Sequence, residues 1–368
     1  MRHLGRIRSG QIGKCEGDDS GAPVAQAAGT QVRNIVEIRQ GGVDACTRLG
    51  PNYRAAVDHV RDGLRRHACP RRDVLERCAH PTPCISQPTH HPLSRATRPS
   101  YGGHVASVPL SIRVGDDPGS ALLFVTASVG GVAEEFLLDT GASRSSIRRS
   151  ERTDAWAVDA ADPGSHGVFG AAAHTRHARV PTITLGTIEI HDLVVDVSDD
   201  DAPAGILGLD VLRGHRVGVR LSAQVLQLDE QAAIDRWRPL TMSSRGHSLV
   251  EVEWEDAAAL AIWDTGASTT VVDADLAAAH PRVFAPTGAT GTGTDAYGHQ
   301  GETAELRMAP AHIGERRFSA TTAATAPLAG LARAGDPPFT MIIGYPLIAQ
   351  ADWVFDLRAR MWGFLDRS

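Results

Sequence analysis

From Val105 onward, apolar and polar residues alternate along the chain with a period of two, the pattern of half-buried strands. The apolar positions of the first two runs are Val108, Leu110, Ile112 and Val114, then Leu123, Val125, Ala127 and Val129. Turn-forming residues separate these runs at Asp117–Gly119 and at Gly130–Gly131. Segments with helical periodicity are few and short, and the best candidates are Asp275–His280 and Glu230–Trp237. We therefore expect a mainly β fold.

The first hundred residues have a different character, with little apolar periodicity and many Arg, His, Pro and Gly residues. All five cysteines lie in this part, at Cys15, Cys46, Cys69, Cys78 and Cys84. They form no closely spaced pair of the kind that holds zinc, so we interpret them as part of an unstructured chain. We expect residues 1–103 to be a disordered extension, or translated sequence that the mature protein lacks.

Composition narrows the function classes. The chain has 368 residues, of which 42% are hydrophobic, and its formal net charge is -6. This is enough chain for two domains, and the charge argues against a nucleic-acid partner. No apolar run approaches the roughly 18 residues that cross a bilayer, and no apolar core follows the basic N-terminus as in a secretory signal. We expect a cytoplasmic protein with no membrane partner, although the start site is doubtful.

A repeat organises the rest of the chain. Phe136–Ser143 (FLLDTGAS) matches Ala261–Ser268 (AIWDTGAS), and further on Ile206–Gly208 (ILG) matches Ile342–Gly344 (IIG). From these glycines onward the two halves align without a gap. The order of the expected strands is therefore the same in both halves.

The repeat also predicts the domain boundaries. We expect a first lobe over residues 104–232, a linker over 233–246 and a second lobe over 247–368. Each lobe is expected to be a closed, barrel-like β structure, and the two are expected to be pseudo-symmetric. The second half is longer between its Asp and its Gly, mostly over Ala323–Pro338, which we expect to be a surface loop.

Each half places an aspartate, Asp139 or Asp264, directly after three apolar residues. This pattern is typical of a buried strand that ends in a carboxylate, and the Thr-Gly that follows allows a sharp turn. If the two loops meet, the two carboxylates cannot both ionise, so they share one proton near working pH. One can then act as a base toward water while the other polarises a peptide carbonyl. A single Asp-Thr-Gly is weak evidence, whereas two copies in matching contexts are strong evidence.

Two such motifs, each followed by an apolar pair and a glycine, resemble the retropepsin-like and pepsin-like aspartic proteases. The resemblance covers about residues 105–364, and the length of each half favours two fused retropepsin-like lobes of the bacterial kind. It implies an endopeptidase without cofactor or metal that acts on a peptide or protein substrate through catalytic Asp139 and Asp264. It implies support of this dyad by Thr140, Gly141, Ser143, Thr265, Gly266 and Ser268. It implies a ψ-shaped strand crossing beneath the dyad, formed by Ile206, Leu207, Gly208, Ile342, Ile343 and Gly344.

The family also covers its cleft with β-hairpin flaps. The matching stretches are Gly164–His177 and Gly288–Gly301, and the implied flap and substrate-binding residues are Gly167, Phe169, Gly170, Gly293, Tyr297 and Gly298. Pepsin-like enzymes carry a flap tyrosine, but the first stretch has only Phe169 in that place. Ala142 and Ala267 stand where many pepsin-like enzymes have a hydroxyl donor. A carboxylate with fewer donors is less stabilised as the anion, so we expect an activity optimum nearer neutral than pepsin's.

Two alternatives accompany this interpretation. The protein could be a peptide-binding module that keeps the aspartic protease fold without turnover, an option that the atypical first flap favours. Ser143 and Ser268 could be nucleophiles, but they lack the G-x-S-x-G setting, so we expect them to bond to the loop backbone or the carboxylate edge. Because a fused pair already holds both aspartates, we expect a monomer.

Overall fold

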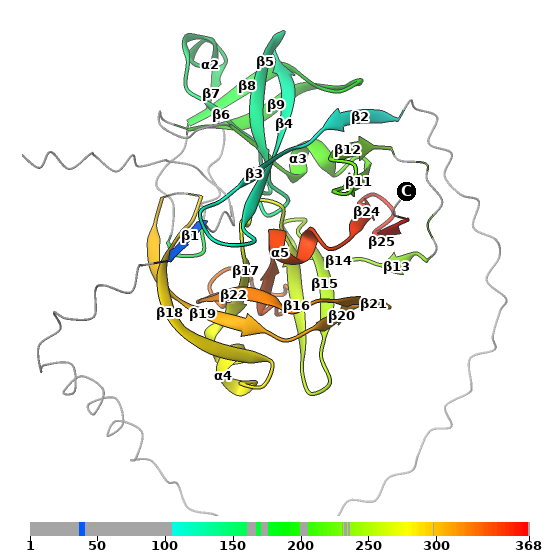
Figure 1. Ribbon diagram of the computed structural model, residues 1–368. Helices are drawn as coiled ribbons and strands as arrows, with labels where there is room; N and C mark the ends of the chain where they lie inside the picture. Colours follow the sequence, from blue (N-terminus) through cyan, green and yellow to red (C-terminus); the bar gives the residue numbers. More distant parts are fainter. Residues whose placement is uncertain are drawn as a thin grey trace, which may run out of the picture.

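The computed structural model describes residues 37–40, 105–159, 167–170, 176–198, 205–229, 231, 234, 236–296 and 298–366. These residues form three sheets (Figure 1). The helices among them are short: α2 (Glu151–Ala155), α3 (Leu209–Leu212), α4 (Ala274–Ala279) and α5 (Tyr345–Ile348). The prediction of a mainly β fold is confirmed, and α4 lies where the sequence favours a helix, whereas the described residues of Glu230–Trp237 lie in no helix.

The first sheet belongs to the first half of the chain. Its strands are β3 (Ser111–Val114), β4 (Ala121–Val129), β5 (Val132–Leu138), β6 (Ser146–Arg148), β7 (Ala157–Val158), β8 (Arg176–Leu185), β9 (Ile188–Ser198) and β10 (Gly205–Leu207). They lie in the order β3-β4-β5-β10-β6-β9-β8-β7, and β4 also pairs with β8. This additional pairing closes six of the eight strands into a barrel. Alternate residues of β4 and β5, such as Leu123, Val125 and Phe136, are buried.

The second sheet belongs mainly to the second half. Its strands are β1 (Glu37–Gln40), β14 (Thr241–Met242), β15 (Ser248–Glu253), β16 (Ala258–Trp263), β17 (Thr270–Asp273), β18 (Phe284–Thr294), β19 (Gln300–Met308), β20 (Ala311–Ile313), β21 (Arg316–Phe318), β22 (Thr321–Ala326) and β23 (Met341–Ile343). The order is β1-β18-β19-β22-β17-β23-β16-β15-β20-β21, and β14 pairs with β15. In this order, the strands from β19 to β20 form a continuous run of paired strands. Only two residues separate β19 from β20 along the chain, so the first and last strands of this run are directly connected.

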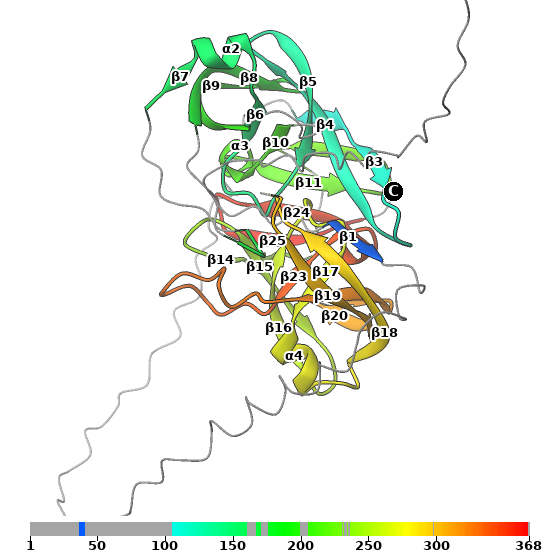
Figure 2. The same cartoon turned by 90° about the vertical axis from the view of Figure 1, so that its left-hand side faces the viewer.

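The third sheet takes strands from both halves. They are β2 (Ala106–Pro109), β11 (Arg216–Arg220), β12 (Val225–Leu228), β13 (Arg238–Pro239), β24 (Asp352–Asp356) and β25 (Met361–Leu365), in the order β13-β25-β24-β11-β12-β2. Figure 2 shows β11 and β24 between the two larger sheets. In the β11–β24 register, Val217 lies opposite Phe355, Val219 opposite Trp353, and Gly218 opposite Val354 between them.

The two hairpins of the third sheet have matching turns. Gln224 ends the turn between β11 and β12, and Arg360 ends the turn between β24 and β25. Both residues have a φ of 53°, and both stand at matching positions of the repeat. The two halves therefore share this unusual backbone conformation at the same place.

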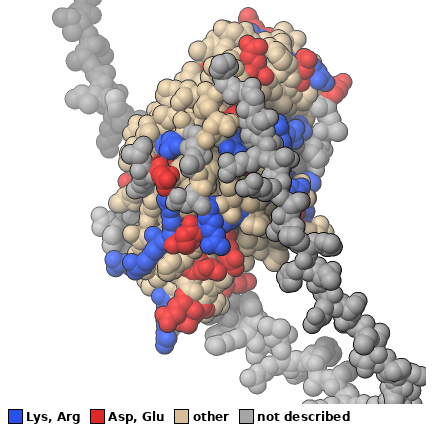
Figure 3. Space-filling model, turned by 90° about the vertical axis from the view of Figure 1, so that its right-hand side faces the viewer, with Lys and Arg blue, Asp and Glu red and all other residues tan. Residues whose placement is uncertain are grey.

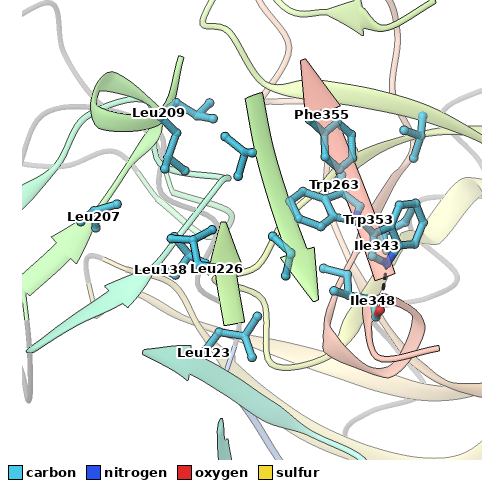
Figure 4. Close-up of a cluster of buried hydrophobic side chains, with 14 of the residues drawn as sticks. Leu123, Leu138, Leu207, Leu209, Leu226, Trp263, Ile343, Ile348, Trp353 and Phe355 are labelled. Atoms are coloured by element: carbon cyan, nitrogen blue, oxygen red, sulfur yellow. Dashed lines mark hydrogen bonds between the residues drawn. The ribbon is translucent and has the colours of Figure 1, made fainter. Parts of the chain in front are cut away.

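The hydrophobic core runs from the first half through the third sheet into the second half. Figure 4 shows Leu138 and Leu226 of the first half in this core, together with the aromatic rings of Trp263, Trp353 and Phe355 of the second half. The ring centroids of Trp263 and Phe355 are 4.4 Å apart. The indole N–H of Trp353 donates to the Ile348 carbonyl at 2.9 Å, so this buried polar group is satisfied.

Three expectations about segments outside the two predicted cores have different outcomes. Most of residues 1–103 lies outside the described residues, but β1 is a strand that pairs with β18. The expected linker 233–246 contains β13 and β14, which extend the third and second sheets. The expectation of a surface loop over Ala323–Pro338 is wrong for its first part. Ala323–Ala326 belongs to β22, and Leu328 and Leu331 are buried because they complete an apolar cluster of the second half.

The described surface mixes charges of both signs. Figure 3 shows basic and acidic side chains interspersed over one face of the molecule. Among the described helices, none has the length and apolar character required to span a membrane.

Candidate active site

Asp139 and Asp264 each follow the last residue of a central strand. β10 pairs in parallel with β5 and sets Leu207 beside Leu138, while β23 pairs in parallel with β16 and sets Ile343 beside Trp263. The Asp139 N–H donates to the Leu207 carbonyl at 3.0 Å, and the Asp264 N–H donates to the Ile343 carbonyl at 3.1 Å. The apolar pair before each later glycine therefore holds the backbone of one aspartate.

Each later glycine lies directly against the loop that follows an aspartate. A Cβ on Gly208 would lie 2.8 Å from the Ala142 carbonyl oxygen, and a Cβ on Gly344 would lie 2.1 Å from the Thr269 carbonyl oxygen. Beyond these glycines, the Leu209 N–H donates to the Ala142 carbonyl at 2.8 Å. Only glycine permits this approach, which explains its place in both copies of the repeat.

The two loops are joined through their threonines. The Thr140 hydroxyl donates to the Trp263 carbonyl at 2.8 Å, and the Thr265 hydroxyl donates to the Leu138 carbonyl at 2.7 Å. Each threonine thus reaches the residue that precedes the opposite aspartate. The two halves are locked together at the base of the site.

The carboxyl groups of Asp139 and Asp264 meet at the Gly141 N–H. This single donor lies 2.9 Å from Asp139 Oδ1 and 3.1 Å from Asp264 Oδ1. The Ala142 N–H also donates to Asp139 Oδ1 at 2.9 Å, and the Gly266 N–H donates to Asp264 Oδ1 at 2.8 Å. Both aspartates have 0% exposure.

The two motif glycines make this meeting possible. A Cβ on Gly141 would lie 2.3 Å from Asp264 Oδ2, and a Cβ on Gly266 would lie 2.4 Å from Asp139 Cγ. No side chain fits at either position while the two carboxyls remain in contact. The structure thus brings Asp139, Gly141, Asp264 and Gly266 into one compact group.

Burial dominates the electrostatics of this pair. Burial raises the pKa of the Asp264 carboxyl well above its usual value, and the nearby charge of Asp139 raises it further. The N–H groups of Gly266 and Gly141 stabilise the anion and oppose this shift of the pKa, but they do not cancel it. A proton on the pair therefore persists to higher pH than on an isolated aspartate.

His247 is a neighbour of the site that no sequence motif marks. It is 2% exposed, and its ring faces the backbone of Gly141. Burial, and then the charge of Arg245, lowers the pKa of His247 to about 4. The two Asp-Thr-Gly motifs are 125 residues apart, and this offset aligns polar His247 with apolar Leu122 of the first half. This difference between the halves is the only signal for His247 that the sequence offers.

Ser145 and Asp210 form a second arrangement that sequence analysis misses. The Ser145 N–H donates to Asp210 Oδ2 at 2.9 Å, and its hydroxyl lies 2.6 Å from Asp210 Oδ1. The same hydroxyl accepts from the Gly208 N–H at 2.9 Å. In the second half, Thr270 Oγ1 accepts from the Gly344 N–H at 3.3 Å in the same way. In both halves, a hydroxyl thus ties the later glycine to the segment that follows the aspartate loop.

The remaining predicted site residues lie on both sides of the aspartate loops. Ser268 is buried and Ser143 is partly buried. Gly293 is buried near the end of β18, and Gly298 lies in the turn between β18 and β19. Gly167, Phe169 and Gly170 belong to a tight turn in which the Gly167 N–H donates to the Gly170 carbonyl at 2.7 Å. Tyr297 lies outside the described residues.

A cavity of about 270 Å³ lies between the second aspartate loop and β18. Thr269 lines it from the loop, Thr290 and Gly291 line it from β18, and Asp117 and Pro118 line it from the first half. Within the part of the chain that the structure describes, no group of three or more His, Cys, Asp or Glu residues could hold a metal ion.

Comparison with known proteins supports an aspartic protease-like protein, the class that the fold and the aspartate pair indicate. The model of the aspartyl protease family matches residues 125–211, which include the first aspartate loop and its later glycine. The crystal structure of conglutin gamma, a basic 7S globulin from lupine seeds, resembles this chain with 11% identity and a TM-score of 0.41. That alignment covers 72% of this chain and 95% of conglutin gamma. A likeness at this level carries no argument about activity. Among curated protein sequences, none matches the chain.

Proposed function

We propose that this protein is an aspartic endopeptidase whose two catalytic carboxyls are those of Asp139 and Asp264. The observation that carries the proposal is the single Gly141 N–H shared between the Oδ1 atoms of both residues. Two carboxyls in such contact cannot both be ionised, so they act as a pair that holds one proton.

The donors around the pair stabilise the one negative charge that the pair keeps. Asp139 Oδ1 accepts the N–H groups of Gly141 and Ala142, and Asp264 Oδ1 accepts those of Gly266 and Gly141. The raised pKa of Asp264 supports a proton held by the pair, and we propose that it lies on Asp264 before the attack. Asp139 then takes a proton from the attacking water while Asp264 donates its proton to the oxygen of the scissile carbonyl. When the C–N bond breaks, the new proton on Asp139 passes to the departing amine nitrogen. A hydroxyl of the tetrahedral intermediate returns its proton to Asp264 as the product carbonyl forms, so the pair again holds one proton.

Reciprocal geometry supports a fused pair of retropepsin-like lobes. The two halves align with an offset of 136 residues after the later glycines, so Val217 corresponds to Trp353 and Val219 to Phe355. Val217 pairs with Phe355, and the corresponding pair, Trp353 with Val219, is also observed. A pseudo-two-fold axis through Gly218 and Val354 accounts for this register. The same axis accounts for the reciprocal bonds of the two threonines, and it makes Thr140, Gly141, Thr265 and Gly266 supports of the dyad. Ile206–Gly208 and Ile342–Gly344 are then the two ψ-shaped crossings, and Ser143 and Ser268 complete the loops.

The proposed substrate is an extended peptide or protein segment bound beneath the flap residues. β1 pairs with β18 as an antiparallel strand along Gly291–Thr294. In the proposal, a substrate strand takes the place of β1 and pairs with the same edge. Gly291 also lines the cavity that Thr269 lines from the second aspartate loop. We further propose a monomer, because one chain supplies both aspartates, and an optimum nearer neutral than pepsin's, because Ala142 and Ala267 offer no hydroxyl.

The test is cleavage of an unstructured protein such as reduced, alkylated casein, with the products sequenced by mass spectrometry. The wild type should release peptides, and a statine-type transition-state analogue should block this release. Asp139→Asn and Asp264→Asn should each abolish cleavage. If the wild type binds the analogue but releases no peptide at any pH from 3 to 8, the proposal fails and the peptide-binding module replaces it.

A further inference from the structure

The cavity beside the second aspartate loop has a counterpart position in the first half. The 125-residue offset between the two Asp-Thr-Gly motifs matches Arg144 with Thr269, which lines the cavity. The structure bears out this match, because a Cβ on Gly208 would meet the Arg144 carbonyl and a Cβ on Gly344 would meet the Thr269 carbonyl. Arg144 and Thr269 therefore occupy equivalent places beside the two aspartate loops.

The strand register extends this correspondence to a second pair of residues. β6 pairs in parallel with β9 and places Ser146 opposite Asp196, while β17 pairs in parallel with β22 and places Val271 opposite Ala324. Ser146 and Val271 are separated by the same offset of 125 residues. Asp196 of the first half therefore corresponds to Ala324 of the second half.

The next strand of each sheet supplies a third pair. β8 places His177 opposite Asp196, and β19 places Glu305 opposite Ala324, both in antiparallel pairings. His177 therefore corresponds to Glu305. The two halves share three equivalent positions but fill them with different side chains.

In the second half, the three positions line an open cavity. Glu305 contributes a carboxylate to it, and Asp117 of the first half contributes another. Hydroxyl groups come from Thr269, Thr290, Thr303 and Thr322. None of the described residues that line the cavity is Lys or Arg, so its charged groups are carboxylates. Its volume of about 270 Å³ is below the roughly 300–1,000 Å³ of pockets for drug-sized ligands, so it suits a single long side chain.

In the first half, the same three positions hold a cluster of polar side chains. Arg144 Nη1 lies 3.5 Å from Asp196 Oδ1, which lies 3.2 Å from His177 Nδ1. The side chains of Asp196 and His177 are 1% and 3% exposed, whereas that of Arg144 is 21% exposed. The buried carboxylate therefore holds the guanidinium in place, and the cation is the member of the cluster that reaches the surface.

We propose that the two halves of the site select substrate side chains of opposite charge, with a basic side chain in the cavity lined by Glu305 and an acidic side chain against Arg144. This inference rests on the proposed function, which places an extended peptide between the two halves. The proposed pseudo-two-fold axis relates Asp139 to Asp264, so equivalent positions lie on opposite sides of the scissile bond. The preferred substrates are then peptides with a basic residue on one side of that bond and an acidic residue on the other.

The first test is the cleavage of a peptide library that varies every position, with the products sequenced by mass spectrometry. The wild type should favour basic over acidic residues about tenfold on one side of the cleaved bond, with the opposite preference on the other side. Glu305→Gln should remove only the basic preference, and Arg144→Gln only the acidic one. Glu251→Gln and Arg148→Gln, at exposed positions, are matched controls and should change neither. Unchanged profiles in Glu305→Gln and Arg144→Gln would overturn the inference.

Removal of Arg144 also leaves the buried Asp196 without its cation, so two further variants keep the test decisive if Arg144→Gln does not fold. Arg144→Lys keeps the positive charge and should keep the acidic preference. Arg144→Gln combined with Asp196→Asn removes both charges and should lose this preference. An acidic preference that survives in the double variant would overturn the role of Arg144.

The second test is peptide binding to the Asp139→Asn chain, which separates this inference from the proposed function. Two sets of fluorescent peptides place one Lys and one Asp on opposite sides of a central apolar pair, at several spacings and in the two opposite orders. At one spacing, one order should bind about tenfold more tightly than the other, and adding Glu305→Gln should reduce this difference. Equal binding of the two orders at every spacing, or binding of neither, would overturn the charge selection. If the wild type cleaves nothing, the proposed function fails, whereas the Kd values of the two orders still decide the inference.

Discussion

Thr140 and Thr265 exchange hydrogen bonds across the boundary between the two halves, with each backbone N–H donating to the hydroxyl oxygen of the other. The two N···O distances are 3.1 Å and 3.0 Å. Together with the bonds from each hydroxyl to Trp263 and Leu138, they form a closed network in which every hydroxyl both accepts and donates. This network fixes the distance between the two aspartate loops.

Replacing Thr265 with valine should destabilise the protein strongly. Valine has a similar shape, but it leaves the Thr140 N–H and the Leu138 carbonyl buried without their partner. The free energy of unfolding should fall by about 3 kcal/mol, as measured by urea denaturation. Thr265→Ser should restore most of it, and Thr126→Val at an exposed position of β4 is the control. Equal urea midpoints for Thr265→Val and Thr126→Val would contradict the network.

Replacing Gly141 with alanine should remove activity while the fold survives. The added Cβ would overlap Asp264 and push the two carboxyls apart. A displacement of about 1 Å costs on the order of a hundredfold in rate, so kcat on a peptide substrate should fall at least that far. Gly214→Ala is the matched control, because a Cβ there would meet nothing within 4 Å. A Gly141→Ala protein with more than a tenth of wild-type kcat would be incompatible with the described pair.

His247 should make the protein sensitive to acid. Its pKa is about 4 in the folded protein, against 6.5 for the free side chain. Between these pH values the unfolded chain binds a proton that the folded protein does not, so stability falls as pH falls from about 6.5 to about 4. The full loss amounts to about 3 kcal/mol. The raised pKa of Asp264 acts in the opposite direction, because the folded protein then keeps a proton that the unfolded chain has released.

His247→Leu separates the two effects. Leucine stands at the matching position of the first half, Leu122, and it cannot be protonated. Between pH 7 and pH 4.5, this variant should lose less stability than the wild type, as judged by urea unfolding at each pH. Parallel losses in the two proteins would show that His247 is not held neutral in the folded state.

Much of the fold can be predicted from the sequence, because a period of two marks individual strands and the repeat relates the two halves of the chain. The alternation in β4 predicts a half-buried strand directly. The loop expected after Ala323 is wrong because alanine-rich sequence has no clear period, and only the packing of Leu328 and Leu331 reveals a buried strand and its continuation.

The candidate site divides in the same way. Repetition places Asp139 and Asp264 at matching points, so their meeting can be predicted from sequence. His247 faces a segment more than a hundred residues away, and no local pattern around it records this neighbour. Its role depends on how the two halves are docked, which only the structure describes.

The central claim is that Asp139 and Asp264 work as one unit, and a double-mutant cycle on kcat tests it most directly. Peptide cleavage should be measured for Asp139→Asn, Asp264→Asn and the double variant at the optimal pH of the wild type. If one proton is shared, either single substitution removes the whole function of the pair, and the double variant should be no slower than the singles. Losses that multiply, or a single variant that retains a tenth of wild-type kcat, would contradict the account.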